Sequence, residues 1–153
     1  PLAMPLSAAT EASAAKVSTS HAWPSDSVAA LHDRIEPANS DDHDIPRFTW
    51  WDHRGSREWV QYDFAAHKPI SEVEIYWFDD TGRGQCRTPA SWQVVSRGPA
   101  GWVPVELVDA SRYTTTPDRF NVVRFKEVVT DAVRLEVQLR ENASAGILEW
   151  KVR

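Results

Sequence analysis

The sequence predicts an all-β domain, in which about eight strands form an antiparallel β-sandwich of the jelly-roll type. Apolar and polar residues alternate with a period of two in several short segments, as in strands that bury one face. Turn-forming residues separate these segments, for example in 96–101 and 141–146. Helical periodicity does not extend beyond a turn or two, so the predicted layers are sheets.

The strands can be placed in order along the chain, and the clearest alternation lies in residues 132–140. The expected strands are 15–20, 58–64, 71–77, 91–97, 102–107, 120–125, 132–140 and 146–152. Before the second strand, residues 25–34 predict a short helical turn with Ser25 or Asp26 as its N-cap. Residues 35–46 have no period and are predicted to form a polar surface loop.

Length and composition indicate one domain without nucleic-acid or membrane partners. The chain has 153 residues, enough for a single core, and its formal net charge is −5 without a run of Lys or Arg. No apolar run approaches the roughly 20 residues that cross a bilayer. Residues 1–13, rich in Ala, Pro and Ser, are expected to be a linker or cloning remnant, and 14–153 the sandwich. We expect a monomer taken from a longer polypeptide.

The sequence gives little support to catalysis by this domain alone. Asp79 and Asp80 are adjacent, so on a strand they point to opposite faces and make a poor acid–base pair. Cys86 is the sole cysteine, which excludes an intrachain disulfide, and a small buried cysteine is the favoured interpretation. An enzyme to which this domain contributes one carboxylate remains the alternative.

Acidic residues gather in and before the 35–46 loop, with His32 and His43 among them. The carboxylates are those of Asp33, Glu36, Asp41, Asp42 and Asp44. Hard oxygen ligands in a loop suit calcium, although the spacing is not that of an EF-hand. A zinc site and a merely solvated acidic loop are the other two interpretations.

Two strand-to-strand connections, 48–59 and 76–89, combine aromatic, acidic and arginine side chains. Sugars are recognised by this combination, because an aromatic ring packs on C–H groups while charged planar groups bind hydroxyls. The chain has eight tryptophans, and most are expected to be structural. Trp59, Trp92 and Trp150 lie inside strands, as core or sheet-surface residues.

Three runs carry a resemblance to a known family: TWWDHRGSREWVQYDF, ISEVEIYWFDDTGRGQCRTPASWQVV and AVRLEVQLRENASAGILEWKV. They resemble the galactose-binding-like jelly rolls of discoidin or coagulation-factor type C. More closely, they are similar to the module appended to secreted bacterial and fungal glycoside hydrolases, notably those with β-L-arabinofuranosidase-type catalytic domains. The resemblance covers residues 14–153, and its most specific parts are 76–92 and 144–150.

The resemblance implies a non-catalytic carbohydrate-binding accessory module, secreted or at the cell surface or in the periplasm. Such a module holds the glycoside hydrolase domain of the same polypeptide near plant or microbial polysaccharide. The alternative is a structural β-sandwich that packs on the catalytic domain and stabilises it without sugar affinity.

The resemblance also implies two sites. The expected carbohydrate-binding residues are Asp52, His53, Arg54, Phe78, Asp79, Asp80, Arg83 and Arg87. Phe78 would be the stacking platform, and Arg87 could equally form a structural ion pair with Asp79 or Asp80. The expected ligands of a structural calcium ion are Asp33, Thr49 and Glu149, with backbone carbonyls near Ala30 and Leu148.

Overall fold

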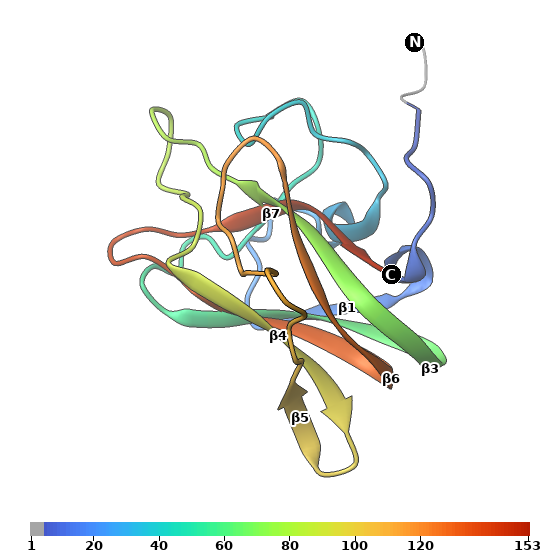
Figure 1. Ribbon diagram of the computed structural model, residues 1–153. Helices are drawn as coiled ribbons and strands as arrows, with labels where there is room; N and C mark the ends of the chain where they lie inside the picture. The colour runs from blue at the N-terminus through green and yellow to red at the C-terminus, as the bar shows by residue number, and fades with distance from the viewer. Residues whose placement is uncertain (1–4) are drawn as a thin grey trace.

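Two long strands, β3 (Arg57–Phe78) and β6 (Phe120–Gln138), organise the structure. The computed structural model describes residues 5–153, and Figure 1 shows both strands doubling back at a shared corner. Register shifts between Asp63 and Lys68 and between Ile70 and Glu72 mark this corner in β3. Because each strand bends there, each serves both layers, and four of the predicted strands are halves of these two.

The two halves of β3 and β6 lie in opposite layers of an antiparallel sandwich, which confirms the predicted fold class. One layer joins the first half of β3 and the second half of β6 to three further strands: β1 (Lys16–Thr19), β4 (Ser91–Gly98) and β5 (Gly101–Pro104). The other layer joins the remaining halves to β2 (Phe48–Thr49) and β7 (Gly146–Val152). The hydrogen-bonded order is β2-β7-β3-β6-β4-β5, with β1 on β3.

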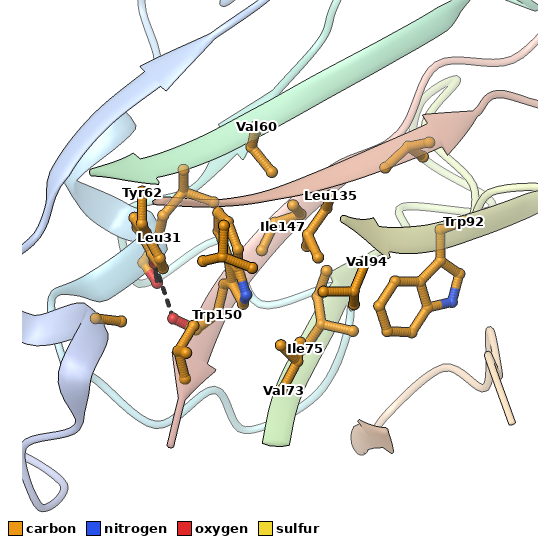
Figure 2. Packing of buried hydrophobic residues seen from close by; sticks show 14 of the residues in the cluster. Leu31, Val60, Tyr62, Val73, Ile75, Trp92, Val94, Leu135, Ile147 and Trp150 are labelled. Atoms are coloured by element: carbon orange, nitrogen blue, oxygen red, sulfur yellow. Dashed lines mark hydrogen bonds between the residues drawn. The ribbon is translucent and has the colours of Figure 1, made fainter. Parts of the chain in front are cut away.

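The core between the layers is rich in aromatic rings, several of which Figure 2 shows packed together. Tyr62 stacks on Trp150 with ring centroids 3.8 Å apart. The Tyr62 hydroxyl lies 2.9 Å from the carbonyl oxygen of Leu31 and 2.8 Å from that of Trp150. Its proton can therefore be shared between two buried acceptors from η2 (Val28–His32) and β7.

Trp92 and Trp59 lie where the alternation predicts. Trp92 is buried, whereas Trp59 lies on the outer face of its layer. There the Arg134 guanidinium carbon lies 4.0 Å from the Trp59 ring centroid and 4.4 Å from that of Trp102. Trp50 and Trp51 follow directly after β2, and Trp50 is fully buried while its neighbour Trp51 is half-buried.

The loops differ from the sequence prediction in two places. Ser27, rather than Ser25 or Asp26, precedes the short 3₁₀ helix η2. The 35–46 loop is not purely a surface loop, since Ser40 and Ile45 are buried against the rest of the domain. No helix within residues 5–153 is long and apolar enough to cross a membrane.

Part of the expected linker contacts the sandwich from Ser7 onward, while residues 1–4 lie outside the described residues. A second 3₁₀ helix, η1 (Glu11–Ala14), buries Ala12 in the core. Ser7 and Arg34 exchange backbone and side-chain hydrogen bonds, and Glu11 pairs with Lys68 at 2.7 Å. These contacts connect the segment to the domain.

Candidate functional site

A cleft of about 360 Å³ lies where three segments meet: 23–26, 47–51 and 78–86. Strand pairing brings the last two segments together, because Thr49 of β2 and Phe78 of β3 are both paired with Gly146 of β7, one on each side. A Cβ atom at Gly146 would lie 2.5 Å from the carbonyl oxygen of Phe48 and 2.8 Å from Cγ2 of Thr49. Only glycine permits this close approach.

The aromatic residues that the cleft offers are Trp23 and Trp51. Trp23 is 38% exposed and Trp51 half-buried, and both line the cleft. Phe78 also lines it but is only 1% exposed, and the Arg47 guanidinium lies 5.2 Å from its ring centroid. The prediction of Phe78 as the stacking platform is therefore corrected. The sequence could have indicated Trp23 as a ligand contact, because it is a tryptophan in a polar loop outside every alternating segment.

Two acids and two arginines supply the charged groups of the cleft: Asp26, Arg47, Asp80 and Arg83. The Thr49 hydroxyl donates a hydrogen bond to Asp26, whose other carboxylate oxygen lies 3.8 Å from Nε of Arg47. Arg83 is mostly exposed and pairs with Asp41 of the 35–46 loop at 3.1 Å. The formal charges of the ionised groups cancel. Sequence reasoning identified Asp80 and Arg83 and missed Asp26 and Arg47, which come from other loops.

Internal hydrogen bonds shape the 78–90 loop around Asp80. Oδ1 of Asp80 accepts from the backbone N–H of Cys86 at 2.9 Å, and its carbonyl accepts from those of Arg83 and Gly84. A Cβ atom at Gly84 would lie 2.2 Å from Oδ2 of Asp80. The loop therefore requires glycine at this position to hold the Asp80 carboxylate beside the cleft.

Asp79 and Arg87, which the sequence also predicted as sugar contacts, hold the same loop from outside the cleft. Asp79 accepts from the backbone N–H groups of Thr81 and Thr88. Nη1 of Arg87 donates to the carbonyl oxygens of Gly84 at 2.9 Å and Cys86 at 2.8 Å. It lies 3.8 Å from Asp80. The structural interpretation of Arg87 is thus the one that the geometry supports.

Cys86 is buried beside Phe78, as expected for a structural cysteine. Burial, together with the nearby carboxylates of Asp80 and Asp26, raises the pKa of its thiol to about 12. A thiol with this pKa is protonated at neutral pH, and the thiolate is the nucleophilic form. Cys86 therefore does not provide a nucleophile.

Asp52, His53 and Arg54 do not line the cleft. Asp52 and His53 instead gather beside His21. The rings of His21 and His53 stack with centroids 3.6 Å apart. Arg54 covers the Trp51 ring at 4.7 Å. Of the predicted 51–57 wall, Trp51 alone reaches the cleft.

The predicted metal ligands fall in two places. Asp33 and Glu149 lie within hydrogen-bonding reach of each other, and Oε2 of Glu149 accepts from the backbone N–H of Arg34 at 3.1 Å. Burial, with the charge of Asp33 adding to it, raises the pKa of Glu149 to about 9, and burial also raises the pKa of Asp33. Thr49 belongs to the cleft, where its hydroxyl binds Asp26.

One carboxylate oxygen of Glu149 is buried without a hydrogen-bond partner among the described residues. This oxygen is Oε1, and the residue as a whole is buried. Two carboxyl groups in contact, one of them buried with an orphan oxygen, form a donor set that suits a hard cation. Asp33 and Glu149 therefore fit calcium.

No family model matches the sequence. No curated protein matches it either. Among solved structures, the chain is similar to one of the β-galactosidase BgaA of Streptococcus pneumoniae, with a TM-score of 0.73 and 18% identity over 95% of this chain and 94% of that one.

Two further similar structures are described as binding modules. One is the family 32 carbohydrate-binding module of C. perfringens NanJ in complex with galactose, with a TM-score of 0.68 and 12% identity, covering 94% and 96% of the two chains. The other is chitosan-binding module 2 of a Paenibacillus sp. IK-5 chitosanase/glucanase in complex with chitotriose, with a TM-score of 0.62 and 19% identity, covering 92% and 97%. These likenesses show that the chain has the galactose-binding-like jelly-roll fold, as the sequence predicted.

Proposed function

We propose that this protein is a carbohydrate-binding accessory module whose ligand is a neutral oligosaccharide bound in the cleft. The observation that carries the proposal is the cleft itself, which combines Trp23 and Trp51 with Asp26, Arg47, Asp80 and Arg83. Aromatic rings offer a flat apolar surface, and carboxylates and guanidinium groups accept from and donate to hydroxyls. The similar structures with bound galactose and chitotriose support the same class of ligand.

The balance of charge in the cleft favours a neutral sugar. An anionic glycan would face Asp26 and Asp80, and a cationic one would face Arg47 and Arg83. A neutral sugar pairs its hydroxyls with both kinds of group. Because the cleft is open and small, we expect a single cleft to bind its sugar weakly. Tethering to an enzyme compensates for weak binding, because it raises the effective concentration of the enzyme near the polysaccharide.

The module breaks no bond in this proposal. Cys86 is a buried neutral thiol, and Asp79 accepts three hydrogen bonds within its own loop. The catalytic partner would be a glycoside hydrolase domain of the same polypeptide, acting outside the cell or at its surface on polysaccharide.

A calcium ion held by Asp33 and Glu149 would be structural. Asp33 follows η2, whereas Glu149 lies in β7, so an ion between them would join the N-terminal segment to the sandwich. Oε1 of Glu149, which has no hydrogen-bond partner among residues 5–153, supports this proposal most directly. Calcium supplies the positive charge that two adjacent carboxylates need. Thr49 is not among the proposed ligands because its hydroxyl donates to Asp26.

The proposed function can be tested by titration with galactose, chitotriose and arabinose- or rhamnose-containing oligosaccharides, followed by tryptophan fluorescence. We expect a saturable change from at least one sugar, because Trp23 and Trp51 line the cleft. Trp23→Ala should abolish most of that change. If no sugar changes the fluorescence, a structural module that packs on the catalytic domain becomes the better description.

A further inference from the structure

We propose that His21, Asp52 and His53 form a second, independent metal site, which takes a divalent transition-metal ion such as zinc. The ligand atoms of the three side chains all lie within 4.8 Å of one another. Two imidazoles and one carboxylate are donors that zinc commonly accepts, and three protein ligands leave a position for water. The site lies outside the sugar cleft and away from the Asp33–Glu149 pair in the sequence, so it goes beyond the proposed function.

Each imidazole makes a hydrogen bond through one ring nitrogen, which determines the nitrogen that keeps a lone pair for a metal ion. Nε2 of His21 lies 2.9 Å from the carbonyl oxygen of Trp51, and a carbonyl can only accept. The proton of a neutral His21 ring is therefore on Nε2, which leaves the lone pair on Nδ1. Nδ1 of His53 lies 2.9 Å from Oε2 of Glu58, so its proton faces that carboxylate and Nε2 keeps the lone pair.

This arrangement is the outer shell that metal-binding histidines usually have. Such a histidine donates its other ring N–H to a carboxylate or a backbone carbonyl, which sets the tautomer and the ring orientation. Glu58 and the Trp51 carbonyl supply one of each here. Glu58 is itself buried and held by the Ser20 and Ser56 hydroxyls, so the His53 ring has a rigid anchor.

The three ligands are accessible to an ion from solvent. Asp52 and His53 are exposed and His21 is half-buried. The carboxylate of Asp52 adds the negative charge that two neutral imidazoles lack. The rings of His21 and His53 stack at 3.6 Å with an interplanar angle of 7°. Stacked rings direct their lone pairs along parallel planes, so binding one ion requires one ring to tilt out of the stack.

His21 is the ring that we expect to tilt. Within residues 5–153, His21 hydrogen-bonds to one carbonyl oxygen, which accepts over a broad range of directions, whereas His53 is held by the anchored Glu58. The tilt makes the proposal visible by NMR, because the ring-current shifts of the stacked protons should change on metal binding. An ion here would also tie the segment before Trp23 to the residues after Trp51, next to the cleft.

Zinc titration of the untagged full chain by calorimetry tests the site, in calcium-containing buffer so that the Asp33–Glu149 pair is not the receptor. We expect one equivalent of zinc to bind, with changes in the ring resonances of His21 and His53. His21→Ala and His53→Ala should each weaken binding by about tenfold or more, and Asp52→Asn should weaken it as well. His67→Ala is the matched control, because His67 is an exposed histidine of β3 outside the site, and it should bind zinc like the wild type.

Thermal melts of the metal-free variants separate loss of the site from loss of the fold. The proposal is overturned if the folded wild type binds no zinc, or if zinc binds with unchanged affinity to both folded histidine variants. If either histidine variant does not fold, two results still test the site. Unchanged zinc affinity in Asp52→Asn together with unchanged His21 and His53 resonances in the wild type would overturn the proposal. Sugar binding is measured separately, so a failure of the zinc site and a failure of the sugar cleft are distinguishable.

Discussion

The side chains of Asp33 and Glu149 lie within hydrogen-bonding reach of each other, although both are acids and Glu149 is buried. Because a cation would satisfy both, we predict that calcium stabilises the folded protein. At a calcium concentration of about 100 times the dissociation constant, the gain is about 2.7 kcal/mol. For a domain of this size, this corresponds to a rise in Tm of about 5–10 °C. Differential scanning calorimetry with calcium and then with EDTA measures it.

Two variants test which residues hold the ion. Glu149→Gln preserves the shape of the side chain but removes its charge, so the calcium-dependent rise in Tm should disappear. Thr49→Ala should retain the rise, because Thr49 donates to Asp26 in the cleft. A wild-type Tm that responds to neither calcium nor EDTA, or a full response in Glu149→Gln, contradicts the proposed site.

The Tyr62 hydroxyl is predicted to be a stabilising group of the core. Tyr62→Phe leaves the carbonyl oxygens of Leu31 and Trp150 without this donor in a buried position, which should cost about 1–3 kcal/mol of unfolding free energy. Urea denaturation measures the loss. Tyr76→Phe is the control, since the Tyr76 ring is also buried but its hydroxyl has no hydrogen-bond partner within the described chain, and we expect a smaller loss there.

The sequence predicted the sandwich and the faces of its strands because both depend on local alternation. Residues 58–64 and 71–77 each show their own alternation, yet they form one strand, since a bulged corner keeps the hydrogen bonding continuous. Trp92 and Trp59 likewise fall on the buried and the outer face of their strands. Alternation reports which face is buried but not where a strand bends.

The cleft was harder to predict because three distant segments build it. Asp80 and Arg83 were identified within one suggestive loop, but Trp23 and Arg47 come from segments with no regular pattern. Their proximity depends on the pairing of β2 and β3 with β7, which the composition of the loops does not encode. For the same reason Phe78 was assigned to the surface, whereas Arg47 covers it.

Cys86 should resist alkylation in the folded protein. With a pKa of about 12 and a buried position, its thiol should react with iodoacetamide at pH 8 only after denaturation. The folded-state pKa lies above the ordinary value of 9.0. Burial of the neutral thiol therefore stabilises the fold below pH 9, and this contribution is lost as the pH rises toward 12. Mass spectrometry after timed alkylation checks the first point, and rapid labelling of native protein would contradict it.

Arg83 and Arg87 lie in one loop but should behave differently on substitution. Arg83 is 62% exposed and makes a surface ion pair, so Arg83→Ala should change the unfolding free energy by less than about 1 kcal/mol while weakening sugar binding. Arg87→Ala removes two hydrogen bonds to carbonyl oxygens and should cost about 1–2 kcal/mol, lowering sugar affinity through loss of loop order.

Arg124→Ala is the matched control for Arg83→Ala. Arg124 is similarly exposed and paired with Glu72, and it lies outside the cleft. Its substitution should leave both stability and sugar binding close to those of the wild type. Equal sugar affinity in Arg83→Ala and the wild type would remove Arg83 from the binding site.

The most direct test of the cleft as a sugar-binding site is a glycan array probed with three proteins in calcium: the wild type, Trp23→Ala and Trp102→Ala. Trp102 is a tryptophan of β5 outside the cleft, so its variant controls for loss of a surface indole. We predict that the wild type and Trp102→Ala bind the same neutral oligosaccharides and that Trp23→Ala, still folded, does not. Absence of binding by the wild type, or unchanged binding by Trp23→Ala, would contradict the proposal.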